Sequence, residues 1–279
     1  EITIAAKPVP RAQAKDFGIL QVNDDRRIVR FVEKPSDPAL LDQLRTPPEV
    51  LTGNDPKLDM IASMGIYIFN KQALLDVLMG NTLEDFGRQI IPQAISAKNV
   101  FSYIFDDYWE DIGTIRSFFE ANLDFARPMP KFNFYDEERP IYTRKRFLPG
   151  SKIENCEIHY SLISDGAIIE GSKLASTIIG NRSIVSANNY LERVIMMGDD
   201  FYESVEDRRL DNEQHRAPCG VGRDCVIKNA ILDKNVRIGN SVWIVNEKKL
   251  NFFDADNYHI RDGIVVVPKN AFIPDGTVI

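Results

Sequence analysis

The chain has 279 residues, of which 44% are hydrophobic and 27% charged, and its formal net charge at pH 7 is −7. This composition supplies enough apolar material for two ordinary domains. The acidic balance argues against a general nucleic-acid or anionic-membrane surface, because both reward clustered Lys and Arg. A small anionic ligand stays possible, since a few local cations suffice to bind it.

The cysteines argue against a secreted disulfide framework. Cys156, Cys219 and Cys225 are odd in number and form no CxxC pair, so we expect buried free thiols and a reducing, cytoplasmic location. No apolar run approaches the roughly 20 residues that span a bilayer, and residues 1–11 lack the regions of a signal peptide. Because a strand-like segment opens the sequence without an initiating Met, we expect a fragment of a longer protein.

The first part of the chain alternates strand and helix signals. Apolar residues in 17–22 and 28–32 flank the polar turn 23–26, which predicts a hairpin. The following signals are, in chain order, a strand over 66–69, a helix over 71–79 capped by Asn70, a helix over 85–90 before Pro92, a strand over 100–105 and a helix opened by Thr114. This alternation predicts an α/β domain over residues 1–127.

The last helix of this domain has one apolar face, and the segment after it is rich in proline. The apolar residues at helical spacing are Ile115, Phe118, Phe119 and Leu123, and we expect them to pack on the sheet. Prolines punctuate aromatic residues through 128–149. We therefore expect a linker that follows an extended path and docks its aromatic rings against both domains.

A short apolar repeat marks residues 150–279. Isoleucine-class residues recur every five or six positions, at Ile153, Ile158, Ile163, Ile168, Leu174, Ile179 and Ile184, and the spacing resumes at Val221, Val226, Ile231 and Val236. Such spacing, with Gly, Asn, Asp and Ser between, fits flat faces of extended chain joined by tight turns, which is a parallel β-solenoid. Charged residues interrupt the repeat at 199–217, which predicts a solvated loop on one face.

Glu33 and Lys34 form the first segment with candidate chemistry. They follow a strand and precede Pro35, which favours extended chain at a sheet end, where ligands of open α/β sheets collect. Lys34 would suit a phosphate oxygen and Glu33 a sugar hydroxyl. An ordinary surface Glu-Lys pair is the alternative that these two residues alone favour.

Two further segments could contribute to the same site. Ser63 and Gly65 stand where a strand begins, so a ligand could approach the backbone at Gly65, although a tight bend with Ser63 bonded to its own backbone is the simpler explanation. Asp111 lies in a loop before a helix, where a carboxylate can hold Mg²⁺ beside substrate phosphates. The alternative makes Asp111 a first-turn carboxylate that the helix dipole favours.

Together with the repeat, these segments resemble ADP-glucose pyrophosphorylases. The resemblance covers nearly the whole chain, through FGILQV, FVEKP, ASMGIYIFN, EDFGRQIIP, DYWEDIGTI, NFYDEERPIYT and IVVVPKNAFIPDGTVI. It implies adenylyl transfer from ATP to glucose 1-phosphate, with release of pyrophosphate, on a nucleotidyltransferase-type α/β domain followed by a left-handed β-helix. The implied reaction is in-line attack of the sugar phosphate on the α-phosphate of ATP, with Mg²⁺ screening the charge.

The resemblance also implies roles for the residues of the first part. Lys34 would bind the sugar phosphate, and Glu33 and Asp85 would bind the glucose hydroxyls. Ser63 and Gly65 would form the wall of the sugar pocket.

A metal ligand and an effector site follow from the same resemblance. Asp111 matches the family's second Mg²⁺ carboxylate, in a loop beneath which Trp109 would pack. Arg182, Lys234 and Lys269 match basic residues at which the cyanobacterial and plant type binds anionic metabolites such as 3-phosphoglycerate, although solvated turn residues explain them equally. The family is tetrameric, so the resemblance implies a homotetramer for the full-length protein.

One family feature is missing from this sequence. Its catalytic domains begin with a glycine-rich loop that cradles the ATP phosphates, so we expect only the sugar-phosphate half of the site and no turnover by this chain alone. The alternatives are a non-catalytic regulatory or assembly module that binds a phosphorylated metabolite, another sugar-1-phosphate nucleotidyltransferase that uses UTP, dTTP or GTP, and an acyltransferase with His159 as its base.

Overall fold

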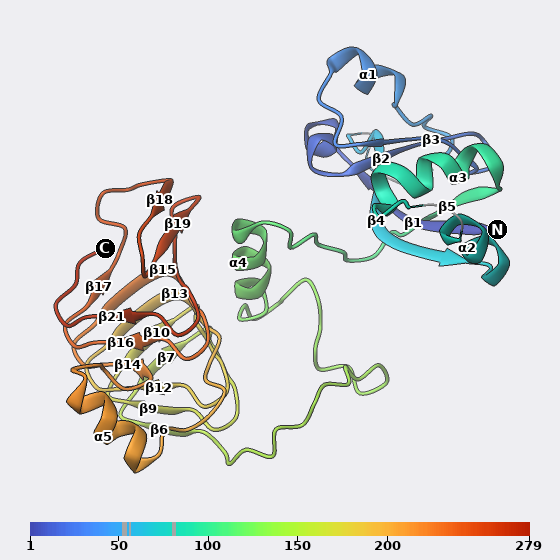
Figure 1. Cartoon of the computed structure of the whole chain (residues 1–279). Coiled ribbons are helices and arrows are strands. Elements are labelled where there is room, and N and C mark those ends of the chain that lie inside the picture. The colour runs from blue at the N-terminus through green and yellow to red at the C-terminus, as the bar shows by residue number, and fades with distance from the viewer. Residues whose placement is uncertain (52–54, 56, 80–81) are drawn as a thin grey trace. The chain divides into compact units, whose positions relative to one another are not determined.

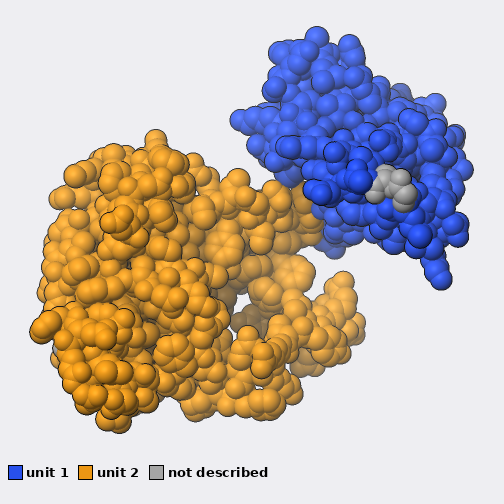
Figure 2. All heavy atoms as spheres, viewed as in Figure 1, with its two compact units in different colours: residues 1–107 blue, residues 108–279 orange. Residues whose placement is uncertain are grey.

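The computed structural model describes residues 1–51, 55, 57–79 and 82–279 (Figure 1). They form two compact units, 1–107 and 108–279, which are described one at a time (Figure 2). This division falls between residues 107 and 108, and the domain limits expected at residues 127 and 150 stay predictions. Within the described residues, no helix is both long and apolar enough to cross a membrane.

A mixed five-stranded sheet forms the centre of the first unit. Its strands are β1 (Ile2–Val9), β2 (Gly18–Val22), β3 (Ile28–Glu33), β4 (Met60–Phe69) and β5 (Val100–Ile104), in the spatial order β3-β2-β4-β1-β5. β1 and β5 run parallel, and the other neighbours are antiparallel. The predicted hairpin is confirmed as β2 and β3, with the Arg26 N–H donating to the Asn23 carbonyl at 2.9 Å across the turn.

Helical segments connect these strands. They are η1 (Arg11–Asp16), α1 (Pro38–Gln43), α2 (Lys71–Leu78), η2 (Phe86–Ile90) and α3 (Ile91–Ala97). The Asn70 side chain caps α2 as predicted, accepting from the Gln72 N–H at 3.0 Å. The expected helix end before Pro92 is wrong, because the π-type turn η2 continues into α3. Pro92 stands in the first turn of α3, directly after the π-type turn.

The second unit is built around a parallel β-helix, which confirms the predicted solenoid. Its strands are β6 (Lys152–Glu154), β7 (Glu157–His159), β8 (Leu162–Ile163), β9 (Ile168–Glu170), β10 (Lys173–Ala175), β11 (Ile178–Ile179), β12 (Ile184–Val185), β13 (Tyr190–Met196), β14 (Gly220–Val221), β15 (Val226–Leu232), β16 (Arg237–Ile238), β17 (Trp243–Ile244), β18 (Phe252–Asp254), β19 (His259–Arg261), β20 (Ile264–Val267) and β21 (Phe272–Ile273). One sheet has the order β21-β16-β14-β12-β9-β6, and the other follows β18-β19-β20-β15-β13-β10-β7 with β8, β11 and β17 joined to it. Successive coils pair in parallel, and β18 to β20 add an antiparallel edge.

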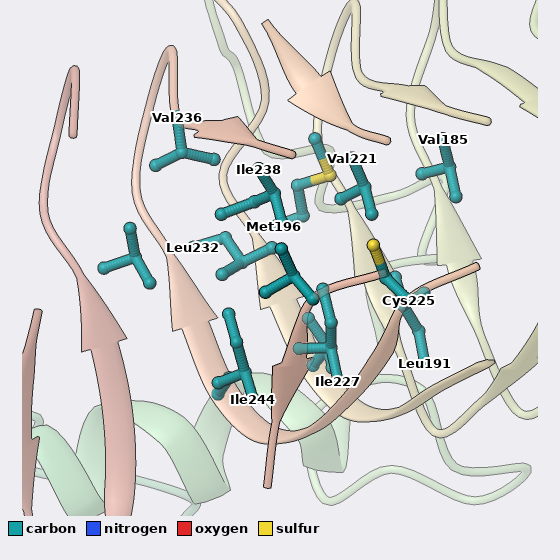
Figure 3. Packing of buried hydrophobic residues seen from close by; sticks show 14 of the residues in the cluster. Val185, Leu191, Met196, Val221, Cys225, Ile227, Leu232, Val236, Ile238 and Ile244 are labelled. Atoms are coloured by element: carbon teal, nitrogen blue, oxygen red, sulfur yellow. The ribbon is translucent and has the colours of Figure 1, made fainter. Parts of the chain in front are cut away.

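Stacked aliphatic side chains fill the β-helix (Figure 3). Leu191 pairs in register with Ile227, and Ile227 with Ile244, so equivalent positions of three coils form one buried row. Cys219 and Cys225 are buried free thiols, as predicted, whereas Cys156 is free but only partly buried. Their sulfur atoms behave here as small apolar packing groups.

The predicted apolar repeat identifies the fold but misplaces some inward positions by one residue. Ile169 and Val185 are fully buried, whereas their neighbours Ile168 and Ile184 are only partly buried or exposed. Adjacent aliphatic residues hide which of the two faces inward, because successive strand side chains point to opposite faces. Ile153 is 46% exposed because β6 is the end strand of its sheet.

Helix α4 (Ile115–Asp124) packs on the β-helix. Its residues Phe119 and Leu123 share one buried cluster with Ile195, Ile231 and Ile264. The predicted apolar face is therefore correct, but the expectation that it packs on the α/β sheet is wrong. The outward aliphatic residues of β13 and β15 provide the partner surface, and no sequence period shows which of two sheets a helix covers.

The proline-rich segment 128–149 contains no helix or strand. Phe134 packs on Phe125 at the end of α4, with ring centroids 4.3 Å apart. Tyr135 and Tyr142 are almost fully exposed, and Phe132 and Phe134 are still 39% and 46% exposed, so the expected burial of the linker's aromatic rings is wrong. Part of the linker thus docks within the second unit.

Candidate functional sites

The end of β3 brings two predicted carboxylates around one glycine. Gly18 pairs with Glu33 across β2 and β3, and a Cβ on Gly18 would lie 2.8 Å from Glu33 Oε2. A Cβ on Gly87 would lie 3.2 Å from the same oxygen and 3.5 Å from Asp85 Oδ1. The carboxylates of Glu33 and Asp85 therefore both flank Gly87. The sequence analysis named the carboxylates but missed these glycines, which keep the space between them open.

Tyr67 adds a hydroxyl group to this sheet end. Its ring stacks on Phe86 with centroids 5.7 Å apart. Burial raises the pKa of Tyr67, a hydrogen bond with Ser63 lowers it, and the charges of Glu33 and Asp85 raise it further. Four polar side chains from β3, β4 and the start of η2 thus gather at one place. Tyr67 was missed, and its even spacing from Ser63 along the strand was the available signal.

Ser63 and Gly65 lie inside β4. The prediction that they stand where a strand begins is therefore wrong. The register between β1 and β4 shifts at this point, which is a β-bulge. Gly65 has φ 70° and donates its N–H to Ser63 Oγ at 3.3 Å, and a Cβ there would meet no atom within 4 Å. The simpler explanation, Ser63 bonded to its own backbone, is confirmed. A role of these two residues as a sugar-pocket wall stays a prediction.

Lys34 does not occupy extended chain, so that part of the prediction is wrong. Its φ is 48°, in the left-handed region, and its N–H donates to the Phe17 carbonyl at 3.0 Å. This bond continues the β2–β3 pairing by one step while the chain turns out of the sheet toward Pro35. Such a conformation in a residue that is not glycine costs roughly 1–2 kcal/mol and marks a position held by its surroundings. The Lys34 side chain is exposed and forms no ion pair among the described residues.

Asp111 lies in the loop before α4, within the second unit. The predicted helix start is confirmed, because Thr114 caps α4 in a reciprocal capping box with Ser117. A Cβ on Gly113 would lie 3.1 Å from Asp111 Oδ2, so the carboxylate folds over that glycine. In the part of the chain that the structure describes, no group of three or more His, Cys, Asp or Glu side chains could hold a metal ion. Asp111 would offer Mg²⁺ one oxygen ligand, which suits an ion that keeps waters and substrate phosphates as its other ligands.

The predicted effector residues converge on Asp199 and Asp200. Lys234 Nζ lies 2.6 Å from Asp200 Oδ1, and Lys269 Nζ lies 2.7 Å from Asp200 Oδ2. The Arg182 guanidinium donates to the Asp199 carbonyl at 3.3 Å. Residues separated widely in the sequence thus meet at two adjacent positions.

The stacking of coils explains this convergence. Backbone hydrogen bonds step from turn to turn along one edge of the β-helix: Arg182 N to Asp165 O, Asp199 N to Asn181 O, Asn235 N to Gly198 O and Asn270 N to Lys234 O. Turn residues in the left-handed region recur on this edge, at Arg182, Gly198, Asn235 and Asn270. Equivalent turn positions of successive coils therefore form a ladder, on which Lys234 and Lys269 are neighbours.

Most described residues of the interruption at 199–217 are exposed to solvent, as predicted, but the segment is not simply a loop. It contains helix α5 (Val205–Glu213), which is anchored by buried charges. Arg237 lies 2.8 Å from Glu203 and 2.6 Å from Asp211, and the side chains of these three residues are 14%, 1% and 4% exposed. The sequence does not show that a buried arginine of a later coil pairs with two carboxylates of this charged segment.

Two groups next to this ionic cluster have strongly shifted pKa values. Burial raises the pKa of Asp199 to about 6, and neither carboxylate oxygen of Asp199 has a partner among the described residues. Burial also raises the pKa of the Cys219 thiol to about 12. Cys219 is therefore a neutral packing residue rather than a nucleophile.

Basic residues also line a cleft near the linker. It has a volume of about 600 Å³ and lies between residues 143–148 and the turn residues Asp165 and Asn181. Arg144, Lys145 and Arg146 line it. The sequence analysis did not single out these cations, although the RKR run was visible. Asp165 and Asn181 are steps of the ladder that leads to Lys234 and Lys269.

His159, the candidate acyltransferase base, stands on β7. Its Nε2 lies 3.2 Å from Glu157 Oε1, which also pairs with Lys173 at 2.8 Å. These are exposed contacts on the outer surface of a coil. They give His159 an ordinary surface role.

Comparison with known protein families accounts for both parts of the chain. Residues 1–127 match a nucleotidyl transferase domain, and residues 146–278 match the GLGC left-handed parallel β-helix domain. The fold class predicted from the repeat and the resemblance, a nucleotidyltransferase-type α/β domain followed by a left-handed β-helix, is thereby confirmed. The chain belongs to the nucleotidyltransferase enzymes with ADP-glucose pyrophosphorylase-like architecture, which are sugar-1-phosphate nucleotidyltransferases.

Proposed function

We propose that the protein is a glucose-1-phosphate adenylyltransferase, which makes ADP-glucose and pyrophosphate from ATP and glucose 1-phosphate for glycogen or starch synthesis. The observation that carries the choice of ADP-glucose is the match of residues 146–278 to the GLGC β-helix domain. A nucleotidyl transferase domain alone would serve equally for other sugar nucleotides.

The proposed reaction forms one bond and breaks one bond at the α-phosphorus of ATP. A phosphate oxygen of glucose 1-phosphate attacks the α-phosphorus, and the bond to the bridging oxygen of pyrophosphate breaks. Pyrophosphate leaves with that electron pair, so no oxidant and no covalent enzyme intermediate is needed. Catalysis of this kind depends on positioning and on charge stabilisation.

The side chains at the end of β3 suit the sugar. Glu33 and Asp85 present carboxylate oxygens around Gly87, and such oxygens accept hydrogen bonds from sugar hydroxyls. Ser63 and Tyr67 add neutral hydroxyl groups beside them. The exposed ammonium group of Lys34 would bind the sugar phosphate, because it has no carboxylate partner among the described residues.

Asp111 is our candidate ligand for Mg²⁺. When bound, the ion would screen the negative charge of the reacting phosphates. Asp111 would hold it with a single carboxylate oxygen, in a loop that the capping box of Thr114 and Ser117 fixes at the start of α4.

Lys234 and Lys269 are our candidate effector site for an anionic metabolite, with Arg182 as a supporting residue. The supporting observation is that the two ammonium groups converge on one carboxylate. Ammonium groups so arranged can bind a phosphate group in the same way. The homotetramer expected from the resemblance stays a prediction.

The test offers glucose 1-phosphate with ATP, UTP, dTTP and GTP in turn to the protein in its complete natural form, and separates the sugar nucleotides formed. We expect ADP-glucose to form at least about tenfold faster than any other sugar nucleotide, a ratio of about 1.4 kcal/mol in transition-state free energy. Preferred formation of UDP-glucose, dTDP-glucose or GDP-glucose would contradict the proposal. Metabolite binding without any sugar-nucleotide product would favour the non-catalytic module instead.

A further inference from the structure

Asp200 occupies the place of a ligand between two lysines. Each of its carboxylate oxygens accepts from a different ammonium group, at 2.6 Å from Lys234 and 2.7 Å from Lys269. The Asn235 amide adds a third donor at 3.2 Å. Two cations and an amide around one small anion are the contacts that a phosphate group would make.

The backbone holds Asp200 in this place independently of the lysines. The Asp200 N–H donates to Asn235 Oδ1 at 2.8 Å. Asn235 is itself held, because it is in the left-handed region with φ 58° and its side-chain amide also donates to Asn270 Oδ1 at 3.1 Å. These hydrogen bonds of the stacked turns therefore position the Asp200 carboxylate in addition to its attraction to the two lysines.

We propose that Asp200 is a built-in competitor at this anion site. A small molecule with a dianionic phosphate group must displace the Asp200 carboxylate in order to bind Lys234 and Lys269. The inference rests on the proposed effector role of these lysines and adds a regulatory element to it: the site is occupied by the protein's own anion until a stronger anion replaces it.

Electrostatics favours exchange over a permanently closed site. The three side chains are between 37% and 49% exposed, so a dissolved anion can reach them. Exposed ion pairs contribute little each, and a phosphate dianion carries a larger charge than one carboxylate. A phosphate dianion can therefore reach the two ammonium groups, and its larger charge favours it over the Asp200 carboxylate.

Acid does not open this site. Hydrogen bonds from Lys234 and Lys269 lower the pKa of Asp200 far below its ordinary value. Asp233 also faces the lysines, since its charge raises the pKa of Lys269, and its Oδ1 accepts from the Lys234 N–H. Asp200 therefore stays charged in moderate acid, so the competitor can be removed by displacement or mutation but not by a moderate fall in pH.

The experiment titrates the chain with inorganic phosphate by calorimetry at constant ionic strength. Asp200→Asn keeps the side-chain shape and removes the competing charge, and we expect it to tighten phosphate binding about tenfold. Asp233→Asn is the matched control, because it removes a neighbouring charge without freeing either ammonium group, and we expect it to change the affinity by less than about threefold. Lys234→Gln added to Asp200→Asn should abolish the gain.

The possible outcomes separate this inference from the effector site itself. Phosphate binding that is equal in the wild type and Asp200→Asn would overturn the competitor role and leave the effector site intact. Weaker binding to Asp200→Asn would also overturn it, and would make Asp200 a residue that positions the lysines. An equal gain in phosphate affinity in Asp233→Asn would show that the loss of any neighbouring negative charge has this effect, and would also overturn the competitor role. No phosphate binding to either the wild type or Asp200→Asn would reject both the effector site and the inference.

Discussion

The two polar sites differ in how their charged groups are paired. The sheet-end site of the first unit lies around Glu33, and the turn-edge site of the β-helix lies around Lys234 and Lys269. At the sheet end, the carboxylates of Glu33 and Asp85 flank a glycine, and Lys34 has no ion-pair partner among the described residues. At the turn edge, Lys234 and Lys269 are both paired with Asp200. The first arrangement leaves hydrogen-bonding groups free for a substrate. The second satisfies its groups internally, and a ligand there has to compete.

The two sites also differ in how the chain brings their residues together. The sheet-end residues come from a hairpin end, a β-bulge and a helix cap, each with its own local geometry. The turn-edge residues come from one position repeated on successive coils. A substitution that disturbs the sheet-end site should therefore have a local effect, whereas the turn-edge site depends on the β-helix as a whole.

The largest expected effect comes from breaking the buried cluster that anchors α5. Arg237→Ala would leave the buried Glu203 carboxylate without its ion-pair partner and Asp211 with Arg216 alone, and we expect a loss of about 3–5 kcal/mol in the free energy of unfolding. Urea unfolding followed by circular dichroism measures it. The matched control is Arg209→Ala, which removes an exposed arginine paired with Glu206 and Glu213 on the same helix and should cost less than about 1 kcal/mol. Equal losses in the two variants would contradict the buried cluster.

A second test concerns the space at the sheet end. A Cβ on Gly18 would lie 2.4 Å from Phe31 Cζ and 2.8 Å from Glu33 Oε2. We expect Gly18→Ala to destabilise the first unit by about 2–3 kcal/mol through overpacking, measured by hydrogen exchange of the sheet amides. Gly65→Ala separates crowding from backbone strain, since it has φ 70° but open space, and should cost about 1 kcal/mol. A larger effect at Gly65 would reverse this assignment.

A third test uses the buried carboxyl group of Asp199. Its pKa is about 6 in the folded chain and 3.8 as the ordinary value, so the folded state binds its proton more tightly than the unfolded state does. Stability should fall as pH rises from about 4 to 6, and stay lower above that range. Asp199→Asn removes this dependence. Relative to the wild type, the variant should gain about 2 kcal/mol between pH 4 and pH 7.5, measured by urea unfolding at each pH. A difference that is flat with pH would show that Asp199 ionises freely in the fold.

The sequence predicted those features that depend on repeated or local patterns. The hairpin at 23–26, the Asn70 and Thr114 caps and the β-solenoid are confirmed, because turn chemistry, capping residues and apolar spacing are local signals. The family resemblance pointed to Lys234 and Lys269 as a pair. The structure supplies the reason for their proximity, which is the stacking of coils.

The failures of prediction share a different cause. The partner of α4, the burial of Glu203 and Asp211, and the role of Asp200 all depend on which surface lies opposite. The type of a residue does not show which surface it will contact in the folded protein. The left-handed conformation of Lys34 was missed for a similar reason, since Pro35 favours extended chain and the pairing of β2 with β3 overrides that preference.

We propose that the sheet end of the first unit binds glucose 1-phosphate through Lys34. This binding is tested most directly by calorimetric titration of glucose 1-phosphate into the wild-type chain, Lys34→Ala and Lys71→Ala in the presence of Mg²⁺. Lys71 is an exposed lysine of the same unit and serves as the control. We predict that Lys34→Ala weakens binding about tenfold or more, as expected for the loss of a charged hydrogen bond, and that Lys71→Ala leaves it unchanged. Equal binding to the wild type and Lys34→Ala, or an equal loss in Lys71→Ala, would contradict this role of Lys34.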